Sequence, residues 1–436
     1  MAGYDMGRGA SPVKAFSQAW LFSEGDGLGA YAPSPLESLL TQEVGAIMGD
    51  SRLLGIRVSQ RAKERGPSRM PEQEEIKEKD RRVREFLDSR GYHALLLKRQ
   101  ANFSWMTCGG LNLVGITTEV GATSLLLFRE AKFLISNNIE LPRMMEEEAL
   151  SAQGFEFKSF EWHEDNEIAI VRELVGDGRL ASDVPFPGAD VLTEEIARLR
   201  YSLTPQEVDR YRWLGRKVSK SLEEVLQEAR PGQKECEVVG RLSQELWRER
   251  IDCVTLMGAA DERIWRFRHP IPSEKTIEKY FMLSVNARKW GLIVSLTRFV
   301  HFGSLPTELR TRYLANVEID CIFMAATRPG AWARDVLFQG IRAYKEKGYP
   351  EEWRLHHQGG AIGYTGRDYR ANLQTMELIQ ENQPFTWNPS ITGTKSEDTI
   401  MATREGPCMI TFPVTYPVLE LQVGGVSFKR PDILEI

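Results

Sequence analysis

The sequence predicts a protein of the α/β class, in the α+β arrangement, built from more than one domain. The chain has 436 residues, which is too long for one ordinary core and suggests about two to three domains. Between residues 70 and 200, short apolar runs alternate with charged amphipathic runs, as expected where strands and helices follow one another. Beyond Phe281, strand-like segments appear again in the second half of the chain.

Composition narrows the class of protein further. With 42% hydrophobic and 27% charged residues, a formal net charge of -5 and a pI of about 5.9, the chain is not basic enough for a nucleic-acid binder. No apolar run approaches the roughly 18 residues that a membrane span needs, and the N-terminus lacks a secretory pattern. The five cysteines form no CxxC pair, which argues against a zinc knuckle and a disulfide framework. We therefore predict a cytoplasmic protein with neither nucleic acid nor membrane as a partner.

The first two segments differ sharply in composition. Residues 1–69 are rich in Gly, Ser, Pro and Arg and are predicted to be a poorly ordered leader, with Met70 as an alternative start of the natural protein. Residues 70–200 form the next predicted domain, which opens with a charged helix ending near Gly91. Its further predicted elements are the strands HALLLK, SLLLF, KFLIS and FEFKSF and a helix through PRMMEEEAL.

The last predicted domain, residues 201–436, opens with a helix whose start is marked by three residues. Thr204, Pro205 and Glu207 fall at the N-cap, N1 and N3 positions, which is the pattern of a capping box with a proline where its missing N–H costs nothing. This helix should stop before Pro231, and a second helix should run through ECEVVGRLSQELWRER.

A hairpin is predicted over FMLSVNARKWGLIVSLTR, residues 281–298, with a tight turn at residues 289–290. That register pairs Ser284 with Ser295, and directly opposed residues on one face have Cβ atoms about 4.5 to 5.5 Å apart. The same face would carry two more polar side chains, Asn286 and Thr297. Either these groups converge on a site, or they form an ordinary solvated sheet face.

Four segments follow one another in a recognisable order: SVN with SLTR, then WRLHHQGGAIGY, WNPS and GTKSEDT. They resemble the DxG and DxTR hairpin, the HGxGHxxG loop, the EP turn and the RxED strand of the Xaa-Pro aminopeptidase and creatinase superfamily. Upstream, FLDSRGYHALLLKRQANFSWMTCGG and LTPQEVDRYR are similar to the start of its N-terminal domain and its linker helix. The resemblance covers about residues 76–412. It implies a creatinase-like N-terminal α/β domain, a pita-bread C-terminal domain and a homodimer.

The resemblance also marks where this chain departs from the family's peptidases, which bind two metal ions. Their ligand positions correspond here to Ser284, Ser295, Gly360, Asn388 and Glu397. Only Glu397 keeps an anionic ligand, because serine and asparagine are weak ligands for hard cations and glycine offers none. We therefore predict no metal and no cofactor.

Creatinase, within the same superfamily, hydrolyses a C–N bond without metal, and ectoine hydrolase looks comparable. By this resemblance we predict a metal-independent hydrolase of a small guanidine, amidine or amide. His269, in RHP, would carry the proton, His356 would stabilise the developing oxyanion, and Glu397 would orient a substrate N–H. The residues predicted to bind the substrate are His357, Gln358, Arg298, Ser284, Ser295, Asn388 and Lys395.

Other interpretations remain open at this stage. The histidines could be structural, and Glu397 with Lys395 could be a leftover ion pair in a strand. The chain could also be an inactive pita-bread protein that binds a ligand or a protein, as the peptidase-like domain of a eukaryotic histone chaperone does. A third alternative is an Xaa-Pro peptidase with an atypical metal site.

Overall fold

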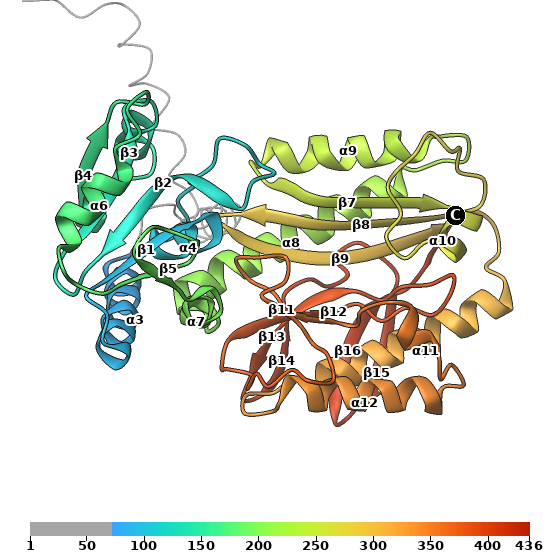
Figure 1. Cartoon of the computed structure of the whole chain (residues 1–436). Coiled ribbons are helices and arrows are strands. Elements are labelled where there is room, and N and C mark those ends of the chain that lie inside the picture. Colours follow the sequence, from blue (N-terminus) through green and yellow to red (C-terminus); the bar gives the residue numbers. More distant parts are fainter. Residues whose placement is uncertain (1–71) are drawn as a thin grey trace, which may run out of the picture. The chain divides into compact units, whose positions relative to one another are not determined.

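The structure is a computed structural model, and it describes residues 72–436 (Figure 1). The predicted leader over residues 1–69 and the alternative start at Met70 lie outside the described residues. The first described helix, α3, spans Gln73–Arg90 and ends at Gly91, whose φ of 68° is left-handed. The predicted end near Gly91 is confirmed, and glycine suits this position because it adopts positive φ without steric cost.

One mixed sheet of six strands follows, in the order β4-β3-β2-β1-β5-β6. Its strands are β1 (Ala94–Arg99), β2 (Val120–Leu127), β3 (Lys132–Asn137), β4 (Phe155–Phe160), β5 (Leu180–Ser182) and β6 (Ala189–Val191). The accompanying helices are α4 (Gln100–Met106), α5 (Leu141–Glu146), η1 (Ser151–Gln153), α6 (Glu167–Val175), α7 (Thr193–Ala197) and η2 (Arg198–Arg200). The four predicted strands are confirmed as β1 to β4. Strands β5 and β6 were missed because three-residue strands carry almost no periodic signal.

Helix α8 spans Pro205–Gln227 and begins as predicted. The Thr204 side chain accepts a hydrogen bond from the Glu207 backbone N–H at 3.3 Å, and Glu207 Oε2 accepts one from the Thr204 N–H at 2.7 Å. The capping box is therefore confirmed. Helix α9 (Glu235–Arg248) follows.

A second sheet has the order β17-β9-β8-β7. Its strands are β7 (Asp252–Ala260), β8 (Tyr280–Lys289), β9 (Leu292–His301) and β17 (Leu434–Glu435). Helices α8 and α9 cover one face of this sheet (Figure 1). Phe281, Leu283 and Val285 of β8 belong to the apolar core that also contains α8 and α9 residues. Because side chains alternate along a strand, the even-numbered residues of β8 point to the opposite face.

The hairpin between β8 and β9 turns one residue later than predicted. Lys289 pairs with Leu292, so the two turn residues are Trp290 and Gly291, with φ of 52° and 76°. A two-residue type I′ turn needs positive φ at both central positions, and glycine supplies the second of them. The predicted turn at residues 289–290 is therefore wrong.

The register changes with the turn. Ser284 pairs with Thr297 and Asn286 pairs with Ser295, in place of the predicted pair of Ser284 with Ser295. The pairing has moved by two positions, and a shift of two leaves every side chain on its original face. All four polar side chains consequently share one face of the sheet, as predicted.

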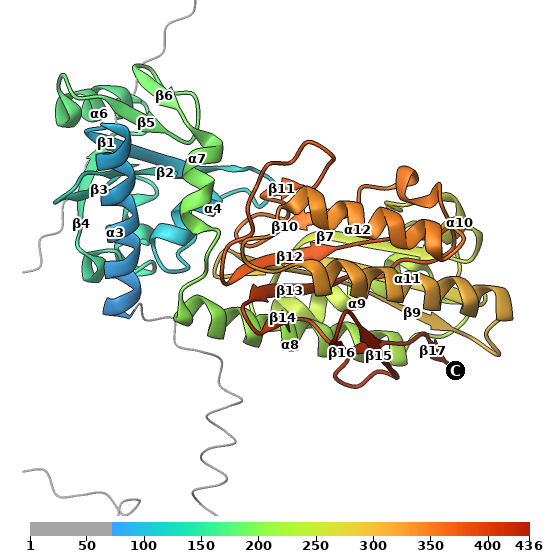
Figure 2. The same cartoon turned by 90° about the horizontal axis from the view of Figure 1, so that it is seen from below.

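A third sheet packs against that polar face and is covered on its far side by two helices (Figure 2). Its order is β11-β10-β12-β13-β14. The strands are β10 (Gly359–Ala361), β11 (Tyr369–Arg370), β12 (Gln383–Trp387), β13 (Asp398–Thr403) and β14 (Gly406–Met409). The remaining elements are α10 (Glu262–Arg266), α11 (Thr307–Ala326), α12 (Ala333–Glu346), η3 (Glu352–Leu355), β15 (Val418–Val423) and β16 (Val426–Pro431). Within residues 72–436, no helix combines the length and apolar character needed to cross a bilayer.

Candidate active site

The carboxylate of Glu397 lies between the second and third sheets, just before β13. Its Oε2 accepts hydrogen bonds from Lys395 Nζ at 2.7 Å, Thr297 Oγ1 at 2.7 Å and Ser284 Oγ at 3.1 Å. The side chains of Lys395 and Glu397 are 4% and 3% exposed, so this is a buried ion pair. Three of the predicted site residues, Ser284, Lys395 and Glu397, are therefore in direct contact.

Two cations face this carboxylate. Arg367 Nη2 lies 3.7 Å from Glu397 Oε1, whereas Lys395 contacts the other oxygen, Oε2. Burial by itself raises the pKa of Glu397, but Lys395 and Arg367 outweigh it and lower this pKa to about 2. Glu397 is consequently ionised at neutral pH.

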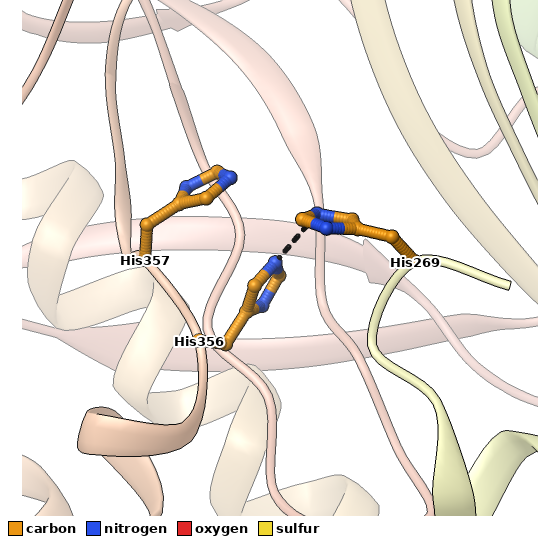
Figure 3. Close-up of side chains that lie close together, drawn as sticks. All are labelled: His269, His356 and His357. Atoms are coloured by element: carbon orange, nitrogen blue, oxygen red, sulfur yellow. Dashed lines mark hydrogen bonds between the residues drawn. The ribbon is translucent and has the colours of Figure 1, made fainter.

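Three histidines gather beside this ion pair (Figure 3). His269 lies in the loop between α10 and β8, whereas His356 and His357 follow η3. The Nε2 atoms of His269 and His356 are 3.0 Å apart. The ring centroids are 4.8 Å apart for His269 and His356, 5.4 Å for His269 and His357, and 4.7 Å for the adjacent pair.

Asn388 connects the two groups of residues. Its Oδ1 accepts from Arg367 Nη2 at 3.4 Å, which leaves its Nδ2 to donate to His356 Nε2 at 3.3 Å. The other nitrogen of that ring, Nδ1, lies 3.2 Å from Ser390 Oγ. His356 Nε2 is thus an acceptor, and the proton between the two histidines belongs to His269 Nε2.

All three imidazoles are held in the neutral form. Burial, followed by the positive charge of Lys395, lowers the pKa of His356 strongly and that of His269 as well. Burial and the charge of Arg367 lower the pKa of His357 to about 3. His357 Nδ1 is buried and has no hydrogen-bond partner. Neutral imidazoles can accept protons or bind metal ions, but they stabilise an anion poorly.

Two predicted substrate-binding residues lie elsewhere. Arg298 is fully buried and pairs with Glu223 at 3.2 Å and Asp398 at 3.0 Å. It points to the face opposite its neighbour Thr297, as alternation along β9 requires, so its predicted contact with substrate is wrong.

The Gln358 side chain is used within its own loop. Its amide nitrogen donates to the carbonyls of Trp353 and His356, and its oxygen accepts from the Tyr344 hydroxyl at 2.9 Å. This amide holds the histidine loop in shape, and the prediction that it binds substrate is corrected accordingly.

The two other positions matched to metal ligands, Ser295 and Gly360, bond to groups other than Glu397. Ser295 Oγ donates to Asn286 Oδ1 at 2.7 Å. Gly360 has a φ of 152° and pairs with β11 and β12; a Cβ there would lie 2.2 Å from the carbonyl oxygen of Tyr369. No side chain can therefore extend from position 360 without moving the backbone.

Arg367, Arg370 and Ser390 belong to this site but were not predicted from the sequence. Arg367 and Arg370 flank the histidines closely enough to lower the pKa of His357. Their only sequence signal is two basic residues in GYTGRDYR, shortly after the glycine loop. Ser390 follows the Asn-Pro turn, and its hydroxyl has no sequence signal that would have pointed to a histidine.

The residues present do not fit a dinuclear metal centre. Two serines, an asparagine and a glycine without space for a side chain stand at four of the five positions. The one remaining carboxylate is already balanced by Lys395 and Arg367, which would repel a divalent cation.

Comparisons with known proteins are consistent with this architecture. A model of metallopeptidase family M24 matches residues 209–411. An uncharacterized peptidase of Staphylococcus aureus strain USA300 is 23% identical over 231 residues, which are 50% of this chain and 64% of that relative. The chain therefore spans less than two thirds of the relative's length.

Solved structures show the same fold at low sequence identity. The Xaa-Pro dipeptidase from Bacillus anthracis has a TM-score of 0.66 at 20% identity, covering 83% of this chain and 100% of its own. A prolidase from Pyrococcus horikoshii OT3 has a TM-score of 0.64 at 18% identity, and the match covers 77% of this chain and 98% of the prolidase. The N-terminal domain of a FACT complex subunit from Cicer arietinum has a TM-score of 0.60 at 11% identity, and the match covers 78% of this chain and 97% of that domain.

Proposed function

Because residues 209–411 match the model of metallopeptidase family M24, we propose that this chain is a hydrolase working without that family's metal centre. It cleaves a C–N bond of a small guanidine, amidine or amide. The observation that carries the proposal is the buried pair of Lys395 with Glu397, at 2.7 Å, where the family's peptidases hold metal ions. A neutral imidazole cluster beside this pair supplies the acid–base chemistry.

His269 is the proposed proton carrier. Its Nε2–H donates to His356 Nε2, so the lone pair of its ring lies on Nδ1. Nδ1 takes a proton from water as the water oxygen bonds to the substrate carbon. The same proton then passes to the leaving nitrogen as the C–N bond breaks, which releases an amine and restores the imidazole.

His356 positions His269 in this proposal. The expectation that His356 itself stabilises the oxyanion does not suit its tautomer, because its N–H is directed to Ser390 and its other nitrogen accepts. The donors better suited to a developing negative charge are Asn388 Nδ2 and the Arg367 guanidinium. Glu397, ionised and facing Arg367 through Oε1, would orient a substrate N–H or a cationic amidine.

The test uses the full-length protein, purified and treated with a strong chelator. It is assayed against creatine-like guanidines, ectoine-like cyclic amidines, simple amides and Xaa-Pro dipeptides. We expect turnover of one of the first three classes that survives chelation. His269→Ala should lower kcat by more than about 100-fold, the lower end of what a proton-transfer group contributes. Glu397→Gln, which removes the charge that orients the substrate, should lower kcat as well. His163→Gln, at an exposed histidine outside the site, is the matched control and should leave kcat unchanged.

Two other outcomes would replace the proposal. Chelator-sensitive cleavage of Xaa-Pro dipeptides, together with two tightly held metal ions per chain, would indicate an atypical peptidase. Binding without turnover would indicate a pita-bread pseudoenzyme, an alternative in keeping with the fold likeness to the FACT complex subunit.

The proposed assembly follows from the family resemblance, and the proposed compartment follows from the cysteines. A homodimer is implied by the family and stays a prediction, which the mass in solution tests. A cytoplasmic location is proposed because all five cysteines are free thiols, which suits a reducing compartment.

A further inference from the structure

Of the chain's six histidines, three converge although they come from two distant segments. One ring nitrogen from each of His269, His356 and His357 lies within 4.8 Å of the other two. Figure 3 shows the three rings turned toward a common point. Adjacent residues in extended backbone usually point apart, yet the rings of His356 and His357 have centroids 4.7 Å apart.

We propose that His269, His356 and His357 form a mononuclear site for a divalent transition metal of the zinc type, separate from the family's dinuclear position. Three imidazoles with an open fourth position are a common ligand set for zinc. Nitrogen–zinc bonds of about 2.0 to 2.1 Å in a tetrahedral arrangement put ligand nitrogens roughly 3.3 Å apart. The Nε2 atoms of His269 and His356 are 3.0 Å apart, so a metal ion can replace the proton that they share.

The surroundings of the three rings support this assignment. Ser390 Oγ contacts Nδ1 of His356 at 3.2 Å, which fixes the ring and leaves Nε2 toward the cluster, as outer-shell partners of metal-bound histidines do. His357 Nδ1 is buried and has no hydrogen-bond partner, so no other contact fixes the tautomer of this ring. His269 is exposed, which gives an ion a path of entry.

The neighbouring charges define what kind of complex forms. Three cations, Lys395, Arg367 and Arg370, lower the pKa values of the histidines and oppose a bare dication. The negative charge of Glu397 instead acts to raise the pKa of His269. An anion in the fourth position, hydroxide or chloride, lowers the charge of the complex and is itself attracted by these cations. We therefore expect the ion to bind together with an anion.

This site has a consequence for activity that rests on the proposed function. When a metal ion binds His269 Nε2, the proton of that neutral ring must sit on Nδ1, which can then no longer accept a proton from water, so zinc should inhibit turnover. The metal-free enzyme is the active form, and chelation should preserve or raise activity.

Cobalt(II) is the probe, because tetrahedral cobalt absorbs visible light and zinc then displaces it. We expect the chelator-treated full-length protein to take up about one cobalt ion per chain with a tetrahedral spectrum. Ser390→Ala should weaken binding by about 10- to 100-fold, and His269→Ala or His357→Ala by more than that. His163→Gln should bind as the unaltered chain does. Thermal melting of each variant checks that it is folded.

The outcomes separate the site from the proposed function, since the cobalt spectrum needs no substrate. Absence of a tetrahedral spectrum, or equal binding in folded His269→Ala and His357→Ala, would overturn the site. A cobalt spectrum lost in these two variants supports it even if no substrate is ever found. Stimulation of turnover by zinc would overturn the inhibitory role.

Discussion

Replacing Lys395 with methionine removes the cation that balances Glu397 while keeping a side chain of similar length. The pKa of Glu397 lies at about 2 against an ordinary value of 4.5, because Lys395 and Arg367 outweigh burial. That difference corresponds to about 3 kcal/mol of stability at neutral pH. Removing one partner of a buried pair costs about 3 to 5 kcal/mol, because the other charge is left uncompensated. We expect a loss of this size in the free energy of unfolding of Lys395→Met, measured by urea denaturation.

The pH dependence of this loss of stability gives the sharper test. A lowered pKa in the folded state stabilises the protein above the unfolded pKa, and this stability is lost as the pH falls from about 4.5 toward 2. In Lys395→Met the burial of Glu397 is opposed only by Arg367 and by hydrogen bonds such as that from Thr297, so its pKa should rise. The gap between the unaltered chain and the variant should therefore be largest near neutral pH and shrink in acid.

Two matched variants complete the experiment. Adding Glu397→Gln to Lys395→Met removes both charges and should recover part of the lost stability. Lys217→Met breaks a pair with Glu249 of similar length, 2.9 Å, but with side chains 35% and 45% exposed, and should cost less than about 1 kcal/mol. The reasoning is refuted if Lys395→Met costs no more than Lys217→Met, or if its cost is the same at about pH 3.5 and about pH 7.

Two further predictions concern the backbone and the first described helix. Gly360→Ala should destabilise the fold by more than about 1 kcal/mol in urea denaturation, because a Cβ at a φ of 152° would lie 2.2 Å from the Tyr369 carbonyl oxygen; an unchanged midpoint would contradict this. Glu75 is buried, but Lys79 and Arg210 outweigh burial and lower its pKa to about 2. The unaltered chain therefore has about 3 kcal/mol of stability above about pH 4.5 that it loses as the pH falls toward 2, and Glu75→Gln should remove this contribution. Parallel acid titrations of the two proteins, followed by circular dichroism, would contradict this if the curves kept a constant separation.

Much of the fold could be predicted because its signals are local. The capping box at Thr204 and the helix end near Gly91 each depend on a few adjacent residues, and both predictions are confirmed. The hairpin turn was misplaced because Trp290 adopts positive φ, which no propensity favours for a bulky aromatic residue. The polar face survived that error because the pairing moved by two positions.

The site was harder to predict, for physical reasons that differ between residues. The face of Arg298 could have been deduced, since it follows Thr297 in a strand and must point the other way. The role of Gln358 could not have been deduced, because the Gln358 side chain depends on the Tyr344 hydroxyl, which contacts it only in the folded chain. Arg367 was missed because a lone arginine in a loop carries no information about which carboxylate it faces.

The exchange of metal ions for fixed cations has a chemical consequence. Lys395 and Arg367 supply positive charge to Glu397 as part of the fold, so this charge does not depend on the concentration of any ion. Ammonium and guanidinium groups can orient a substrate and stabilise an anion through N–H donors. They cannot coordinate a water molecule and lower its pKa as a bound dication does. At the position of the ion pair, activation of water must therefore come from a neighbouring base, and the neutral imidazole of His269 lies beside the pair with the lone pair of its Nδ1 to offer.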